Sequence, residues 1–86
     1  MYGQTSVNRY NFDMDLVRET CLEGEFDGFD QDKIFTLANG EKFQQAHYKY
    51  RYHYAYRPQV KVLRDGSRYY LDIDGMGEVI EVRRIN

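Results

Sequence analysis

The segment HYKYRYHYAYRP, residues 47–58, carries a tyrosine at every second position from Tyr48 to Tyr56. Successive side chains of a β-strand point to opposite faces, so these five tyrosines would share one face of an extended chain. Basic and histidine side chains fill most of the intervening positions and would share the other face. An α-helix, with its period of 3.6 residues, would scatter the rings around its axis. The segment therefore predicts a β-strand with one tyrosine face.

The size and composition of the chain indicate a single globular domain. Its 86 residues leave no room for a second core, and 42% apolar with 30% charged residues is an ordinary globular composition. Aromatic residues make up 16% of the chain while Leu, Ile and Val are sparse, so rings must supply much of the core. Cys21 is the single cysteine, and residues 1–15 contain neither a signal peptide nor an apolar span. We therefore expect a soluble, cytoplasmic protein with no membrane partner.

The net charge of −2 conceals an asymmetry between the two halves of the chain. Residues 1–41 hold three basic and nine acidic residues, a net charge of −6, whereas residues 42–86 hold nine basic and five acidic residues, a net charge of +4. Acidic and basic strands could pair across a sheet, or a basic patch over residues 49–68 could bind phosphates or acidic partners. We favour pairing, because a nucleic-acid-binding domain usually carries an overall positive charge.

Alternation and turn residues outline five or six short strands and no strong helix. Residues 1–17 are polar and predict an N-terminal arm, with a short helix over Met14, Leu16 and Val17 as an alternative. Residues 18–26 predict one strand with an acidic face, and residues 33–37 predict a second. Residues 18–86 therefore predict an all-β domain, a small antiparallel barrel of the SH3-like or OB-like kind.

Two hairpins have predictable registers. A three-residue loop over Ala38, Asn39 and Gly40 would pair Phe35 with Phe43, whereas a two-residue Asn-Gly turn would pair Phe35 with Gln44. We prefer the first, because it pairs two rings. A tight turn at Asp65-Gly66 would pair Val62 with Tyr69 and Val60 with Leu71, and would place Arg57 opposite Asp74.

The facing of the tyrosines follows from these registers. Phe43 should point inward at an odd position, whereas Val60 and Val62 point inward at even ones. A bulge near Gln44–His47 would reconcile the two, and Pro58 marks a second interruption. The tyrosines occupy even positions, as Val60 does, and would then point inward as well. We therefore predict that the three central rings (Tyr50, Tyr52 and Tyr54) belong to the core and that Tyr48 and Tyr56 are exposed.

The order IFTLANGEKFQQ, YKYRYHYAYRPQVKV, YYLDIDGM and VIEVRRI resembles a group of small bacterial proteins of unknown function, over residues 22–85. In that group a strand of the form F-x-L-x-N-G-x-x-aromatic-x-Q precedes a tyrosine-rich strand that ends in P-x-V. Phe43 stands where the group often has tryptophan. The resemblance implies a compact SH3-like barrel and supplies no catalytic residues.

No constellation of residues points to catalysis. The chain lacks a phosphate-binding glycine loop, a nucleophile elbow and an HExxH motif. His47 and His53 lie about 20 Å apart along a straight strand, too far to share one metal ion. Asp72 and Asp74 could bind a cation. The simpler interpretation is that they lie on a solvated strand face and pair with Lys61 and Arg57. We expect a protein that is not an enzyme and holds no cofactor or metal.

We expect a non-catalytic protein-interaction module. Tyrosine and arginine are the residues that most often anchor interfaces. The partner would be a peptide, another protein, or a second copy of this chain bound through exposed strand edges. The alternative is a single-stranded nucleic-acid-binding domain, in which bases stack on the rings and basic side chains hold the backbone. The candidate binding residues are Tyr48, Arg51, Tyr56, Arg57 and Tyr70.

Overall fold

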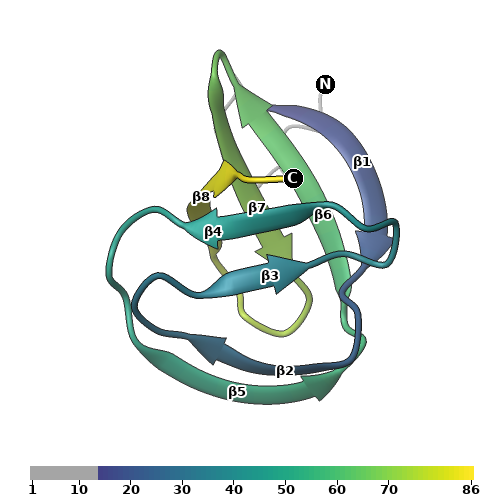
Figure 1. Cartoon of the computed structure of the whole chain (residues 1–86), viewed down its shortest axis with the longest axis vertical. Helices are drawn as coiled ribbons and strands as arrows, with labels where there is room; N and C mark the ends of the chain where they lie inside the picture. Colours follow the sequence, from purple (N-terminus) through teal and green to yellow (C-terminus); the bar gives the residue numbers. More distant parts are fainter. Residues whose placement is uncertain (1–13) are drawn as a thin grey trace, which may run out of the picture.

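The computed structural model describes residues 14–86, and this part of the chain is all-β, with eight antiparallel strands and no helix (Figure 1). The predicted fold class is confirmed. Leu16 pairs with Leu63 in a strand, so the alternative of a short helix over residues 14–17 is wrong. Residues 1–13 of the predicted arm lie outside the described residues. The strands are β1 (Asp15–Cys21), β2 (Glu25–Phe29), β3 (Ile34–Thr36), β4 (Lys42–Gln45), β5 (Arg51–Tyr56), β6 (Gln59–Asp65), β7 (Arg68–Ile73) and β8 (Val79–Arg84).

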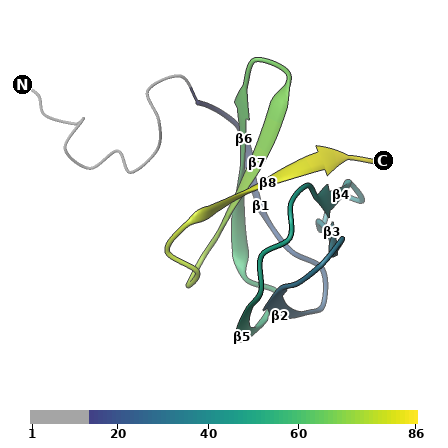
Figure 2. The same ribbon diagram turned by 90° about the vertical axis from the view of Figure 1, so that its left-hand side faces the viewer.

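The strands form two sheets rather than one closed barrel. Six of them follow the order β1-β6-β7-β8-β4-β3, and the other two, β2 and β5, form a separate layer below β3 (Figures 1 and 2). The predicted single strand over residues 18–26 is divided at Gly24, whose φ of +71° turns the chain from the large sheet into the small one. Main-chain pairing between the β2 and β3 regions is confined to the residues beside this turn, where the Glu23 N–H donates to the Thr36 carbonyl at 2.8 Å.

The core lies between the two sheets and is built from phenylalanine and aliphatic side chains. Phe26, Phe29 and Phe35 pack edge to face or tilted, with ring centroids 6.2–6.3 Å apart. The rings of Phe43 and the half-buried Tyr69 pack with their centroids 5.6 Å apart. Rings do supply much of the core, as the composition predicts, but they are phenylalanines. The other buried members of this core are Leu22, Leu37, Val60, Val62, Leu71, Ile73, Met76, Ile80 and Val82.

One predicted hairpin register is confirmed and the other is wrong by two residues. Phe35 pairs with Phe43, and Gly40 takes a left-handed φ of +96° in the loop between them. The β6–β7 turn, in contrast, uses Gly66 and Ser67, so Val62 pairs with Leu71 and not with Tyr69. Gly66 supplies its φ of +62° at the first loop position instead of the second. A shift of two residues preserves the strand period, so each side chain keeps its predicted face.

The prediction that the central tyrosines are buried is wrong. The switch from odd-numbered to even-numbered inward positions occurs at Arg57 and not near Gln44–His47. Inward positions are odd on both β4 and β5, where Gln45 is buried and Ala55 packs on the core. Arg57 then adopts a left-handed φ of +48°, and the inward positions of β6 begin at the even residue Val60. The tyrosines therefore have the opposite facing to Val60, although both occupy even positions.

Candidate interaction surface

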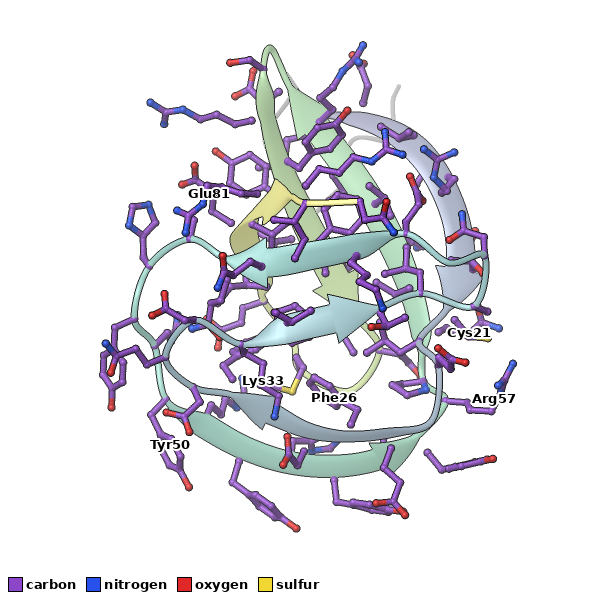
Figure 3. The ribbon with its side chains drawn as sticks, in the orientation of Figure 1. Cys21, Phe26, Lys33, Tyr50, Arg57 and Glu81 are labelled. Carbon is purple, nitrogen blue, oxygen red and sulfur yellow. The ribbon has the colours of Figure 1, made fainter. Side chains whose placement is uncertain are left out.

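The five tyrosines of the sequence motif are all exposed, and we call them together the tyrosine face: Tyr48, Tyr50, Tyr52, Tyr54 and Tyr56. Each of these residues is between 52% and 68% exposed. Tyr50 points away from the body of the molecule in Figure 3. The last three rings stand on β5 at alternate positions, which are about 6.6–6.8 Å apart along a strand. These three rings therefore form a ladder of solvated rings on the outer side of the small sheet, and Tyr48 and Tyr50 precede it in the chain.

Strand β2 supports this face from one side. Glu25 pairs with Tyr56 and Gly28 with Tyr52, and the register shifts by one residue between these two pairs. The shift brings the backbone of β5 onto Gly28, where a Cβ atom would lie 2.0 Å from the Arg51 carbonyl oxygen. Gly28 is consequently the residue that allows the two strands to approach. On its other side β5 has no strand partner within residues 14–86, so it is an edge strand.

The buried Gln45 side chain holds the segment that leads into β5. Its amide nitrogen donates to the carbonyls of His47 and Lys49, at 2.9 and 3.1 Å. Its amide oxygen accepts the Asp30 N–H at 3.0 Å. A side chain with no exposed surface that satisfies three backbone groups fixes the path of the connection. Tyr48 and Tyr50, which precede β5, are positioned by this contact.

The basic and histidine side chains beside the tyrosines are paired with Glu78 of the β7–β8 connection and with Glu81 of β8. Lys49 and Arg51 bind the two carboxylate oxygens of Glu78 at 2.5 and 3.0 Å, and Arg51 also donates to the Met76 carbonyl. The hydrogen bond from Lys49, followed by that from Arg51, lowers the pKa of Glu78 below its ordinary value. His47 lies 3.1 Å from Glu81. These cations therefore face the body of the molecule, and much of their charge is balanced there.

Carboxylates border the tyrosine face on the β2 side. Glu25 is the direct cross-strand neighbour of Tyr56, and Glu23 precedes it at the Gly24 turn. Both are exposed, and neither forms an ion pair within the described part of the chain. Asp27 is different, because a hydrogen bond from Lys33 lowers its pKa. Glu23 and Glu25 also line a groove of about 240 Å³ between β2 and β3, with the exposed Ile34 on its other wall.

The predicted binding residues do not all meet on one surface. Tyr48 and Tyr56 lie on the tyrosine face, and Arg57 follows it as an exposed residue. The Arg57 guanidinium lies 3.6 Å from the Cys21 thiol (Figure 3), a contact for which the sequence carries no signal. Arg51 turns inward to Glu78. Tyr70 belongs to β7 of the large sheet, between Leu63 and Glu81, and is half-buried.

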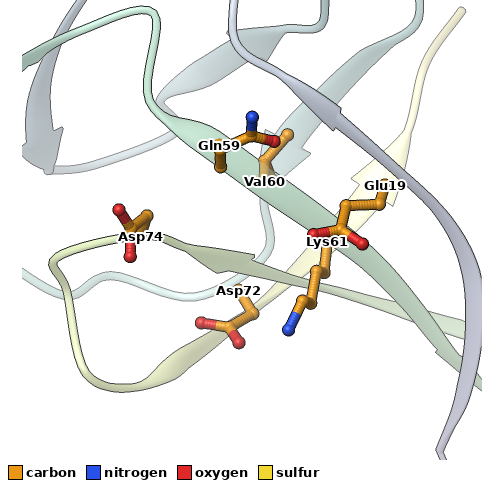
Figure 4. A pocket seen from close by; sticks show the side chains of 6 residues that line it. All are labelled: Glu19, Gln59, Val60, Lys61, Asp72 and Asp74. Atoms are coloured by element: carbon orange, nitrogen blue, oxygen red, sulfur yellow. The ribbon is translucent and has the colours of Figure 1, made fainter.

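A second, polar cavity of about 230 Å³ lies against β1, β6 and β7 (Figure 4). Asp72, in its wall, is only 3% exposed, so its predicted place on a solvated strand face is wrong. It occupies a central strand, directly opposite Lys61 on β6. Asp74 is exposed, and its N–H donates to Gln59; Arg57 is not its partner. Within residues 14–86 no group of three or more potential ligand side chains is placed to hold a metal ion.

Comparisons with protein-family models, with curated proteins and with solved structures found no match to this chain. Across residues 14–86 there is no helix with the length and hydropathy needed to cross a membrane.

Proposed function

We propose that this chain is a non-catalytic protein-interaction module whose contact surface is the tyrosine face. The observation that carries the proposal is the exposure of all five tyrosines, three of which stand in one row on the edge strand β5. Tyrosine offers a large, rigid contact area with a polar end, and it is enriched where proteins bind each other. Grouped aromatic side chains in solvent commonly mark such contact sites. The rings contribute little to the core, so their presence favours a role in binding.

Single-stranded nucleic acid is the alternative ligand, because bases stack on aromatic rings. Such a ligand also needs cations beside the rings to hold its phosphates. Lys49 and Arg51 are paired with Glu78 on the inner side of β5, and Glu25 stands beside Tyr56. This distribution of charge favours a protein partner over a nucleic acid. Arg57 is an exposed cation at the end of the face, and it could contact either ligand.

A peptide-display selection on the immobilised protein tests the proposal. The matched variant carries Tyr52→Thr, Tyr54→Thr and Tyr56→Thr, because threonine keeps a high strand propensity while it removes the rings. We expect selected peptides to bind the wild type at least roughly tenfold more tightly than this variant, since aromatic anchors dominate interface energies. A control with Leu16→Thr and Ile85→Thr removes exposed apolar side chains away from β5 and should bind like the wild type.

Two further measurements on the same samples separate the other ligands. A fluorescent oligothymidylate titrated at low and high salt should show no binding that depends on the three tyrosines. Sedimentation equilibrium reports whether the face binds a second copy of the chain. Selected peptides that bind the threonine variant as well as they bind the wild type would refute the proposal, and so would ring-dependent binding of the oligonucleotide alone.

A further inference from the structure

We infer that the partner of the tyrosine face is a second copy of this chain, joined in a two-fold symmetric dimer through the open edge of β5. This inference rests on the proposed function and names the partner of the same surface. The two β5 strands pair antiparallel, so that the two small sheets become one sheet in the order β2-β5-β5-β2. Three features of the described residues lead to it: the backbone groups at this edge, the side chains beside them, and the position of the nearest charges.

The backbone of β5 presents its tyrosine residues to the open edge. The Arg57 N–H donates to the Gly24 carbonyl at 2.8 Å, at one end of the pairing with β2. At the other end, a Cβ atom on Gly28 would lie 2.0 Å from the Arg51 carbonyl oxygen and 3.0 Å from the His53 nitrogen. Main-chain groups of odd-numbered residues therefore face β2 on both sides of the register shift. Because successive residues of a strand direct these groups to opposite edges, those of the three tyrosines face outward.

This alternation determines which residues of two copies can pair. In an antiparallel ladder, two residues that exchange hydrogen bonds stand directly opposite each other, with Cα atoms about 5.5 Å apart. Since the tyrosines are the residues of β5 that direct these groups outward, each tyrosine pairs with a tyrosine. The register that uses all three places Tyr54 opposite Tyr54 of the second copy, and Tyr52 opposite Tyr56 on either side. This register is unchanged by a two-fold rotation, as a symmetric dimer contact requires.

The side chains at this edge are complementary to themselves. Directly opposite rings have Cβ atoms about 4.5–5.5 Å apart, and aromatic pairs are among the favourable cross-strand pairs. The outward row of β5 consists of Tyr52, Tyr54 and Tyr56, so two copies bring no like charges into direct opposition on this face. The row of rings on each copy becomes a double row on one face of the shared sheet.

The two edges of the large sheet carry features that oppose strand addition. The pairing of β1 is irregular between Leu16 and Arg18, and this strand also carries the charges of Asp15 and Glu19. The strand β3 has only three residues. Bulges, charges and short strands are the usual means by which proteins block pairing at an edge. β5 has six residues with tyrosines along its outward row, and it is the outermost strand of the small sheet in Figure 1.

The charges near the tyrosine face lie away from this contact. Glu25 stands on β2, on the far side of β5 from the open edge. The two copies of Glu25 would be at least three strand spacings apart, about 14 Å, which exceeds the Debye length of about 8 Å at physiological ionic strength. On the inner side of the sheet Arg51 falls opposite Arg57 of the second copy. The charge of Arg51 is balanced by Glu78, and the Arg57 guanidinium lies 3.6 Å from the Cys21 thiol of β1.

The size of the contact sets its strength. The three tyrosines of β5 are between 52% and 66% exposed. With about 150–250 Å² for each tyrosine, they bring roughly 300–450 Å² per copy to the contact. A standard stable interface covers about 800 Å² per partner. The dimer should therefore be reversible, with a dissociation constant in the micromolar range.

Sedimentation equilibrium of the whole 86-residue chain tests the inference at concentrations from about 1 μM to about 1 mM. We expect the wild type to pass reversibly from monomer to dimer across this range. A wild type that stays monomeric at the highest concentration would overturn the inference, and this result requires no variant.

Opposite charges at position 54 test the register. Tyr54→Lys and Tyr54→Glu each place two like charges directly opposite one another, so each variant should dimerise at least roughly tenfold more weakly than the wild type. An equimolar mixture of the two should recover association, because lysine then stands opposite glutamate. Tyr54 is half exposed, and circular dichroism checks that both variants keep the fold.

The matched controls are Tyr48→Lys and Tyr48→Glu, which change an exposed tyrosine that precedes β5 by the same charges. These variants should dimerise within roughly twofold of the wild type, because position 48 lies outside the paired strands. Equal weakening by the variants at positions 48 and 54, or a mixture that does not recover association, would overturn the inference.

Amide hydrogen exchange distinguishes strand pairing from rings that stack face to face. Exchange at Tyr52, Tyr54 and Tyr56 should slow in concentrated protein, whereas exchange at His53 and Ala55, whose amides face β2, should not change. Unchanged exchange at the three tyrosines of a dimeric sample would overturn strand pairing. A monomeric wild type that binds selected peptides through its tyrosines would refute this inference and leave the proposed function intact.

Discussion

Substitution of Gly28 by alanine should be among the most damaging single-methyl changes in this chain. Gly28 has a φ of +111°, a region that costs a residue with a side chain about 1–3 kcal/mol. Its new Cβ would also lie 2.0 Å from the Arg51 carbonyl oxygen, far inside ordinary contact. Because that neighbour is backbone, relief requires β5 to move from β2 and disturbs the pairs Gly28–Tyr52 and Phe29–Arg51. Two lost hydrogen bonds add about 1–3 kcal/mol at about 0.5–1.5 kcal/mol each.

Gly66→Ala is the matched control for this change. Gly66 also has a positive φ, +62°, but a Cβ built there meets nothing within 4 Å, so its substitution carries the backbone cost alone. Urea unfolding followed by far-ultraviolet circular dichroism gives both free energies of unfolding. Gly28→Ala should lose about 1–3 kcal/mol more than Gly66→Ala, a large part of the stability of a small domain. Equal losses for the two variants would refute the close approach of β5 to Gly28.

Three further predictions concern charge, core and surface. Lys49 and Arg51 lower the pKa of Glu78, so their pairing stabilises the fold above the ordinary carboxyl pKa of 4.5 and this contribution disappears on acidification towards the lower folded-state pKa. The free energy of unfolding should therefore fall more steeply between about pH 5 and pH 3 in the wild type than in Glu78→Gln, and parallel urea-unfolding profiles would contradict the pairing. Ile73→Val removes one methylene from a fully buried site and should cost about 0.5–1.5 kcal/mol by urea unfolding, whereas no loss would argue against its place in the core. Tyr54→Thr changes a ring that is 52% exposed and should alter stability by less than about 0.5 kcal/mol, so a loss above about 2 kcal/mol would mean that the ring is structural.

Local sequence signals predicted the all-β class and one turn, although five or six strands were expected and eight are present. Alternation located most of the strands, and the pairing of Phe35 with Phe43 followed from Gly40 and from the match of two rings. The β6–β7 turn shows the limit of such signals. Asp65-Gly66 and Gly66-Ser67 are both acceptable two-residue turns, and both leave every side chain on the same face. Facing patterns alone cannot choose between registers that differ by two residues.

The exposure of the tyrosine face was not predictable from the pattern, because one backbone torsion decides it. A positive φ at an arginine has no sequence signature comparable to that of glycine. Counting alternate positions across Arg57 therefore assigns the tyrosines to the wrong face of the strand. The ion pairs of Glu78 were missed for another reason. Lys49 and Arg51 meet this residue across a sequence separation of 29 and 27 residues, and only the tertiary fold brings them together.

The left-handed Arg57 also separates two kinds of sequence constraint. Upstream of it the even positions face water, and downstream of it they face the core, although the alternation reads as one continuous segment. The composition of the outward row can therefore drift by mutation with little penalty to folding, while Val60 and Val62 stay under selection for packing. A fold arranged in this way can change what it recognises without changing what holds it together. We expect variation among descendants of this chain to concentrate on the outward side of β5.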